Sequence, residues 1–205
     1  MSEYVAVTET AKLIRKALRE SFPGVKFSVR SEKYAGGASI NIGWTDGPTT
    51  PQVEHVAGAF EGSYFDGMID YKGSRFHKLD GERVHFMADY IFCNRHHTDR
   101  AICSAIIAAA MEYGTKNLPT VEDFKQGDCL SRGPMSDEHE TFWSWSNIIH
   151  RTMEEQDRYG KPREEPPAVT PQPSKTLARV EFDGSDNYSH SQTSVAIHEV
   201  RGPAQ

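Results

Sequence analysis

A period-two alternation of apolar and polar residues, which occurs twice between residues 25 and 45, constrains the fold most strongly. The two runs cover residues 25–30 and 38–45, on either side of a loop that contains Gly36 and Gly37. Because side chains alternate between the two faces of a strand, this pattern predicts a β-hairpin with one buried face. The residues expected on that face are Val25, Phe27, Val29, Ile40, Ile42 and Trp44.

Amphipathic helical patterns flank this hairpin on both sides. Ahead of it, apolar residues recur at helical spacing from Thr8, a suitable N-cap, to the stop at Phe22–Gly24. After it, Thr49 or Thr50 can cap a second helix in which Pro51 suits the first position. The order of helix, hairpin and helix predicts an α+β fold, with a small antiparallel sheet packed against three to four helices.

The region after residue 80 predicts one more sheet segment and further helices. Aromatic and β-branched residues from Arg83 to Asn94 predict a long strand, or two strands with a bulge. Thr98 then caps an apolar helix that Gly114 closes, and Ser136 opens a helix that ends near Gly160. The inward positions of the strand region are expected to be Val84, Phe86, Tyr90 and Phe92.

Composition divides the chain into three parts. We expect residues 1–160 to form a single α+β domain, in which residues 119–160 are a helical extension. Residues 161–175 contain five prolines and no helical or strand period, which is typical of a linker. Residues 176–205 are predicted to be a mobile, flexible C-terminal tail.

Charge and cysteine content limit the function classes. The net charge of −6 lies entirely beyond residue 118, because residues 1–118 carry 14 Lys+Arg against 14 Asp+Glu. This balance excludes a strongly basic nucleic-acid coat and is too mild for a duplex mimic. No apolar run approaches the roughly 18 residues of a membrane span, and three cysteines are an odd number without framework spacing. We therefore expect a soluble, cytoplasmic protein with free thiols and no membrane contact.

A cluster of histidines and cysteines offers one candidate for chemistry. Imidazole and thiolate are ligands that zinc prefers, but Cys93-x2-His96 is not followed by a second ligand pair at zinc-finger distance. We therefore expect packing and surface histidines here, with no catalytic residues and no cofactor. A metal site remains the alternative, and its ligands would be His85, Cys93, His96 and His97.

A basic surface offers a second candidate. Seven cations occur within 22 residues, on the first helix and on the outer face of the hairpin, and Tyr34 beside them can stack on a base or fill a partner pocket. A plain solvated surface is the other interpretation. The residues of this binding candidate are Lys12, Arg15, Lys16, Arg19, Lys26, Arg30, Lys33 and Tyr34.

Several runs in residues 8–115 resemble a known family. They are Thr10 to Arg30, Tyr34 to Pro48, Phe60 to Gly62, Phe65 to Asp70, and Tyr90 to Arg95. Together they resemble large polyvalent protein associated domain 29. That resemblance implies a phage or plasmid setting, inside very large multi-domain proteins or in short stand-alone chains, and it brings no catalytic residue set.

These observations lead to two hypotheses. The first is a non-enzymatic accessory protein of a phage or plasmid, which binds nucleic acid or a host protein in the host cytoplasm. The company of antirestriction proteins in such elements suggests counter-defence, by analogy. The second hypothesis is a small metal-dependent enzyme that uses the cluster between residues 85 and 103. Oligomeric state cannot be read from the sequence.

Overall fold

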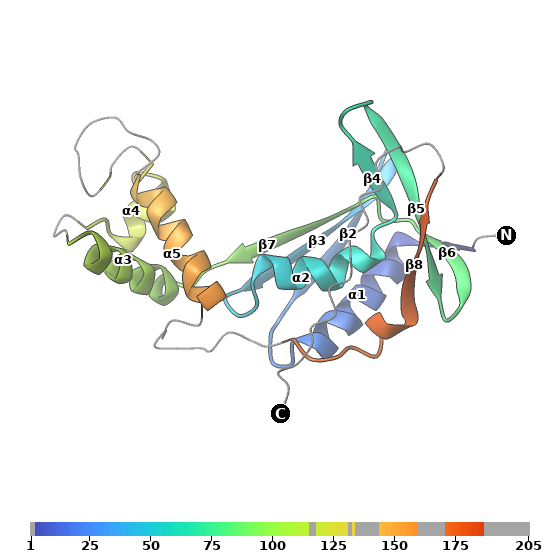
Figure 1. Ribbon diagram of the computed structural model, residues 1–205, viewed down its shortest axis with the longest axis horizontal. Coiled ribbons are helices and arrows are strands. Elements are labelled where there is room, and N and C mark those ends of the chain that lie inside the picture. Colours follow the sequence, from blue (N-terminus) through green and yellow to red (C-terminus); the bar gives the residue numbers. More distant parts are fainter. Residues whose placement is uncertain (1–2, 115–117, 131–132, 134–143, 160–170, 187–205) are drawn as a thin grey trace.

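A computed structural model of the chain describes residues 3–114, 118–130, 133, 144–159 and 171–186. The described elements form two groups, each with its own hydrophobic cluster. One group contains two β-sheets and the N-terminal helices, and the other contains three helices (Figure 1). The architecture is α+β, as predicted, but both sheets mix parallel and antiparallel pairs.

Helix α1 (Val7–Ser21) lays an apolar stripe on the first sheet. It begins ahead of the predicted cap Thr8, with Ala6 at the N-cap position and the Thr10 hydroxyl donating to the Ala6 carbonyl (3.1 Å). The helix ends before Phe22, and Gly24, at a φ of 87°, turns the chain toward the hairpin. The buried apolar residues of α1 are Val7, Ala11, Ile14, Ala17 and Leu18.

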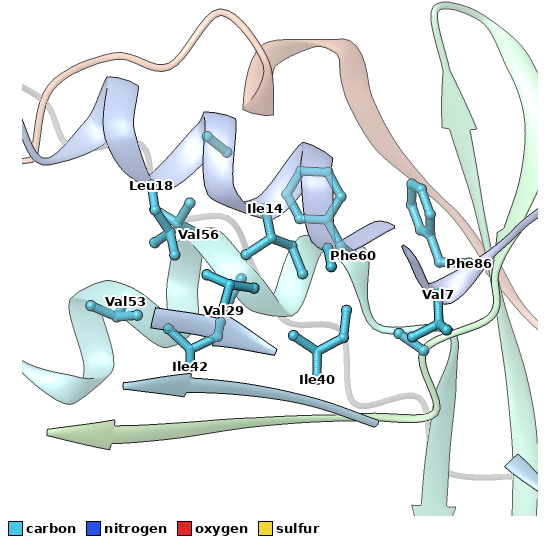
Figure 2. Packing of buried hydrophobic residues seen from close by; sticks show 14 of the residues in the cluster. Val7, Ile14, Leu18, Val29, Ile40, Ile42, Val53, Val56, Phe60 and Phe86 are labelled. Carbon is cyan, nitrogen blue, oxygen red and sulfur yellow. The ribbon is translucent and has the colours of Figure 1, made fainter. Parts of the chain in front are cut away.

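The predicted hairpin forms two strands of a three-stranded sheet. Strands β2 (Ser28–Tyr34) and β3 (Gly37–Thr45) are antiparallel, and Val29 lies opposite Ile42. Four residues of the predicted face are buried, namely Val29, Ile40, Ile42 and Trp44, whereas Val25 and Phe27 lie ahead of β2 and are partly buried. The third strand, β7 (Tyr90–His96), pairs in parallel with β3. One face of this sheet packs against α1 and α2 (Thr50–Ala57), as Figure 2 shows, while most side chains of the opposite face are exposed.

The second sheet has five strands. Strands β1 (Glu3–Val5), β6 (Glu82–Phe86), β5 (Tyr71–Leu79) and β4 (Ser63–Asp66) follow in that order, and β8 (Val180–Ser185) pairs with β5. Strand β1 is parallel to β6, and the other pairs are antiparallel. This sheet therefore joins the first residues of the chain to a segment more than 170 residues away.

The run from Arg83 to Asn94 is two strands of different sheets. The chain leaves β6 after Phe86 and enters β7 at Tyr90, and its inward-outward alternation changes between them. Val84 and Phe86 are buried as predicted, but on β7 the core side is taken by Ile91 and Cys93. The prediction that Tyr90 and Phe92 point inward is therefore wrong.

Asp89, in the connection between β6 and β7, ties the two sheets together. Its carboxylate accepts hydrogen bonds from Ser63 Oγ (2.9 Å), the Ala38 amide (3.1 Å) and Lys72 Nζ (2.9 Å). Burial by itself raises the pKa of Asp89, but these hydrogen bonds outweigh burial and hold the pKa below its ordinary value. The carboxylate is thus a charged junction at the edge of the core.

The hydrophobic core of the first group lies between α1, α2 and the sheets (Figure 2). The 3-10 helix η1 (Gly58–Phe60) carries Phe60, whose ring centroid lies 5.5 Å from that of Phe86. Beside them, a Cβ at Gly62 would lie 1.7 Å from the Phe86 carbonyl oxygen. Only glycine therefore fits at this close approach of two backbone segments.

Helix α2 begins with the predicted cap. The Thr49 hydroxyl accepts from the Gln52 amide (3.4 Å), and the Gln52 side chain accepts from the Thr49 amide (2.9 Å). Pro51 occupies the first turn, as expected. The apolar side chains of this helix that are buried against the core are Val53, Val56 and Ala57.

The helical group contains α3 (Asp99–Tyr113), α4 (Val121–Gln126) and α5 (Trp145–Tyr159), beyond the end of β7 (Figure 1). The predicted ends of α3 are confirmed, because Thr98 caps its start and Gly114 adopts a left-handed conformation at its end. The predicted opening residue Ser136 lies outside the described residues. The buried side chains of the second cluster are Ile102, Ala105, Ile106, Ala109, Cys129, Trp145, Ile148, Ile149 and Met153.

The segment 171–186 is ordered against the first group, which corrects part of the predicted mobile tail. Glu20, near the end of α1, accepts hydrogen bonds from Ser174 Oγ (2.8 Å), the Thr176 amide (2.8 Å) and Thr176 Oγ1 (3.1 Å). The 3-10 helix η3 (Leu177–Arg179) then leads into β8. The rest of the predicted linker and tail, residues 161–170 and 187–205, lies outside the described residues.

No helix in the described ranges is both long enough and apolar enough to cross a membrane.

Candidate functional site

The exposed face of the β2–β3–β7 sheet carries polar and aromatic side chains in regular rows. Arg30 lies opposite Asn41, and Asn41 lies opposite Phe92. The next row along the strands contains Ser28, Gly43 and Asn94, and the row after that pairs Thr45 with His96. Since these residues alternate with the buried ones, the same period-two pattern that builds the core also builds this face.

A hollow of about 1340 Å³ opens on this face. The loop before β2 supplies one wall, the three strands supply the floor, and the loop after β3 supplies the far end. The polar side chains that the strands and first loop contribute to its lining are Lys26, Ser28, Arg30, Asn41, Thr45, Asn94 and His96.

Five of these side chains are free to meet a ligand. Within the described part of the chain, none of them forms a side-chain hydrogen bond or ion pair, and four of the five are exposed. Amides, an imidazole and two cations together supply hydrogen-bond donors, acceptors and positive charge. The five residues, hereafter the hollow set, are Lys26, Arg30, Asn41, Asn94 and His96.

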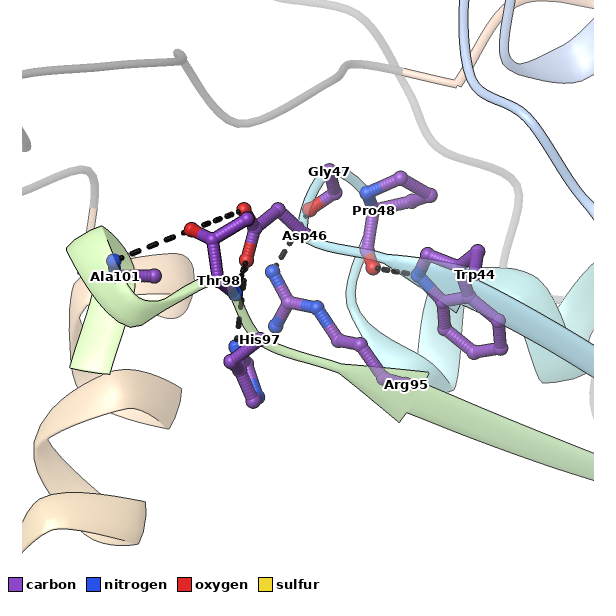
Figure 3. A network of polar contacts seen from close by, with 8 residues as sticks. All are labelled: Trp44, Asp46, Gly47, Pro48, Arg95, His97, Thr98 and Ala101. Carbon is purple, nitrogen blue, oxygen red and sulfur yellow. Dashed lines mark hydrogen bonds and ion pairs between the residues drawn. The ribbon is translucent and has the colours of Figure 1, made fainter. Parts of the chain in front are cut away.

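The one carboxylate in the lining is committed to the fold (Figure 3). Asp46 accepts hydrogen bonds from the Thr98 amide (3.1 Å) and the Thr98 hydroxyl (2.8 Å), and His97 Nδ1 lies 3.8 Å from the same carboxylate. Asp46 and Gly47 both have positive φ, which forms the tight turn at the rim. Asp46 therefore joins the rim of the hollow to the N-terminus of α3.

Two further hydrogen bonds in Figure 3 fix the same rim. Trp44 Nε1 donates to the Pro48 carbonyl (2.9 Å), and Arg95 donates to the Gly47 carbonyl (2.9 Å). Both donors lie on the core side of the sheet, where Trp44 is 2% exposed. The loop that closes the hollow is thus held from beneath by side chains of two of the three strands that form its floor.

Two aromatic side chains continue the open face beyond the hollow. The rings of Tyr90 and Phe92 are stacked, with centroids 6.2 Å apart and an interplanar angle of 24°. Phe92 is 50% exposed, and Lys72 Nζ lies 5.5 Å from the Tyr90 ring centroid. Sequence reasoning missed both rings, because a change of sheet between β6 and β7 leaves no local signal in an apolar run.

The structure divides the predicted basic residues between two surfaces. Lys26 and Arg30 lie together in the hollow. Lys12, Arg15, Lys16 and Arg19 are exposed on α1, which covers the other face of the sheet.

Two of the four α1 cations also have partners within the fold. Lys12 pairs with Glu9 (2.8 Å), and Arg15 donates to the Val29 carbonyl (2.6 Å) at the free edge of β2. Lys33 and Tyr34 are exposed near the tip of the hairpin, at the far end of β2 from Lys26. The predicted set therefore does not form one continuous patch.

The alternative metal ligands do not converge. His85 Nδ1 lies 3.0 Å from the Arg75 carbonyl in the second sheet, His96 lies on the open face, and His97 lies beside Asp46. Cys93 packs against the core, and burial raises its pKa to about 12. Among the described residues no three His, Cys, Asp or Glu side chains are grouped to hold a metal ion. This set therefore supports neither a metal centre nor a thiolate nucleophile.

Comparison with known proteins bears on the first group of elements. No curated protein matches the chain, and no solved structure does. A family model does match, over residues 5–98. The match ends at the residue that caps α3, so it includes the whole β2–β3–β7 sheet and stops before the helical group, earlier than the predicted limit at residue 115. The model that residues 5–98 match is that of large polyvalent protein associated domain 29, the family that the sequence resembles.

Proposed function

We propose that this chain is an accessory protein of a phage or plasmid and that it binds nucleic acid through the hollow set. The family match supports the setting. The observation that carries the binding proposal is the grouping of Lys26 and Arg30, both exposed and unpaired in the described part of the chain, with three polar side chains in one hollow. The activity belongs in the host cytoplasm, in counter-defence.

Charge complementarity favours nucleic acid over a protein partner. The lining holds two cations, Lys26 and Arg30, against the single carboxylate of Asp46, so its net charge is positive. Arginine and lysine hold phosphate oxygens, and the amides of Asn41 and Asn94 suit base edges or sugar hydroxyls. This local charge contrasts with the chain as a whole, whose net charge is −6. Binding is therefore expected at one place on the surface.

The test compares two double variants of the full chain that lose equal charge. Lys26→Gln with Arg30→Gln removes both cations of the hollow, whereas Lys12→Gln with Lys16→Gln removes two cations of α1. Binding to labelled DNA and RNA oligonucleotides is measured by fluorescence anisotropy at several salt concentrations. We expect the hollow variant to bind more weakly and to lower the salt slope by roughly 1.4 to 1.8, for two lost phosphate contacts.

The control fixes the interpretation. The α1 variant should have nearly the same salt slope as the parent chain, with a change much smaller than the one expected for the hollow variant. Equal losses in the two variants would mean that general charge, not the hollow, governs binding. If the parent chain binds no oligonucleotide at low salt, nucleic acid is the wrong partner and a host protein takes its place.

A further inference from the structure

We propose that the ligand of the open face is single-stranded nucleic acid, with an unpaired base stacked on Phe92 and the adjoining phosphates held by Arg30 and Lys26. This inference rests on the proposed function and names its substrate class. DNA and RNA share the chemistry that it invokes, namely an exposed base face and a phosphodiester backbone.

The aromatic pair argues for a base as the ligand. Phe92 is half exposed although it stands in the middle of β7, and its ring is held by stacking on Tyr90. A ring that is fixed in place and open on one side is a suitable platform for a planar base. Lys72, beside the Tyr90 ring, is paired with Asp89 (2.9 Å), so the unpaired positive charge nearest to the platform in the same row is that of Arg30. The platform thus offers a ring face with a cation two strands away.

The register places the platform and the cations at complementary positions. Arg30, Asn41 and Phe92 occupy one row across three neighbouring strands. Neighbouring strands lie about 4.8 Å apart, so the backbones of Arg30 and Phe92 lie about 10 Å apart across the row. A base on Phe92 therefore leaves its phosphate free to reach Arg30, and the Asn41 amide lies between them.

Gly43 gives an independent reason to expect close approach of a ligand. It lies in the central strand, where glycine is costly, yet the pairing is regular on both sides of it and its φ is not positive. A Cβ there would meet no atom nearer than the Asn94 carbonyl oxygen, at 4.0 Å. Neither a bulge nor backbone crowding explains the glycine. A ligand in the hollow explains the glycine, because the missing side chain leaves space for the ligand at the floor.

Base stacking on a side chain separates single strands from duplexes. In a duplex each base face is already covered by its neighbours, so the Phe92 ring has no partner there. Phosphate contacts, by contrast, are available in both forms. The two kinds of contact should therefore respond differently to mutation.

Two variants of the full chain test the substrate class. Phe92→Ala removes the platform, and Gly43→Val fills the floor with a side chain whose Cβ meets no atom of the fold nearer than 4.0 Å. Phe65→Ala is the matched control, since Phe65 is 56% exposed on β4, in the other sheet. Affinities are measured for oligonucleotides of about twelve nucleotides, a typical site size, as thymine DNA, uracil RNA and a mixed-sequence DNA duplex. Thermal melting by circular dichroism verifies that each variant is folded.

We expect Phe92→Ala to weaken single-strand binding by about 5- to 140-fold, the range for loss of one stacked base. Its duplex affinity and its salt slope should not change, because no phosphate contact is lost. Gly43→Val should weaken single-strand binding with an unchanged melting temperature, and Phe65→Ala should have no effect. Equal affinities for single-stranded DNA and RNA would support the substrate class as proposed. A higher affinity for one of them would identify that nucleic acid as the ligand.

The outcomes separate this inference from the proposed function. If both strand forms bind equally well and Phe92→Ala changes neither, the stacking inference is overturned while nucleic-acid binding stands. If the Lys26 and Arg30 variant binds as the parent chain does but Phe92→Ala weakens single-strand binding, the stacking inference stands. The proposed role of the two cations is then overturned. If no oligonucleotide binds, both proposals fail.

Discussion

His77 occupies an unusual position for a titratable residue. It is 3% exposed in β5, between the rings of Phe86 and Phe182, with centroid distances of 5.2 and 5.6 Å. Its Nδ1 forms no hydrogen bond within the described part of the chain. Burial lowers the pKa of His77 to about 4, and the nearby Arg75 and His85 act in the same direction. The neutral ring is therefore the form that the fold accepts.

This burial predicts acid sensitivity. Between about pH 6.5 and about pH 4 the unfolded chain binds a proton at His77 that the folded chain does not, so the free energy of unfolding falls as pH falls. The full loss is about 3 kcal/mol. His77→Leu should remove most of this dependence, as measured by urea unfolding at about pH 7 and about pH 5.

The window above about pH 5 excludes the carboxylates with lowered pKa values, and the comparison with His77→Leu separates His77 from Glu61, whose pKa is raised by burial. The lowered pKa values of Glu20 and Asp89 also cost stability in acid, but only as pH falls below their unfolded values near 4. His55→Leu is the control, since His55 is exposed on α2. An unchanged pH dependence in His77→Leu would show that His77 is not the titrating group.

At the scale of elements, the sequence predicts those features of strands and helices that depend on residues close together in the chain. The hairpin register follows from alternation around Gly36 and Gly37, and the starts of α2 and α3 follow from the capping side chains of Thr49 and Thr98. Arg30 lies on the outer face of the hairpin, as predicted, and Lys26 lies in the loop before it, while their role in binding stays a prediction. Each of these rests on residues a few positions apart.

Pairing between distant segments was not predictable. The parallel pairing of β3 with β7 joins residues about fifty positions apart, and β8 reaches β5 across about a hundred. Alternation tells which side chains share a face but not which sheet the strand joins. Asn41 and Asn94 are ordinary polar positions in the sequence, and His96 is there a surface histidine or an alternative metal ligand. Only the strand pairing places these three residues on the same open face as Arg30.

The docking of residues 171–186 should depend on Glu20. Its carboxylate receives hydrogen bonds from Ser174 and Thr176, which lower the pKa of Glu20. Glu20→Gln replaces one acceptor oxygen by a donor, so at least one of these bonds is lost. We expect faster cleavage within 171–186 in limited proteolysis, followed by mass spectrometry. Glu54→Gln, an exposed change on α2, should cleave as the parent chain does.

Cleavage rates that Glu20→Gln leaves unchanged would mean that the β5–β8 ladder alone holds the segment. The protection of residues 171–186 from cleavage should also depend on pH. Because the folded pKa of Glu20 is lowered, its contribution is present above the unfolded pKa near 4.5 and is lost as pH falls through the folded value.

At the scale of the whole molecule, the described residues form two hydrophobic clusters that share no residue. The family match covers most of the first cluster and none of the second. The hydrogen bonds from Thr98 to Asp46 connect them at the end of the sheet, where the rim of the hollow meets α3. The helical group therefore touches the candidate site while having its own core. The predicted single domain 1–160 thus contains two packing units.

This division predicts that the two units lose stability separately. Ile149 is fully buried in the second cluster, and Ile42 is fully buried in the first. Ile149→Ala should destabilise the helical group by about 2 to 5 kcal/mol through the cavity that it creates. Hydrogen exchange should then quicken in α3 and α5 and stay unchanged in β2 and β3, with the opposite result for Ile42→Ala. If either variant quickens exchange in both groups equally, the two clusters unfold as one cooperative unit, and the Thr98–Asp46 junction couples them more strongly than two hydrogen bonds of ordinary strength can.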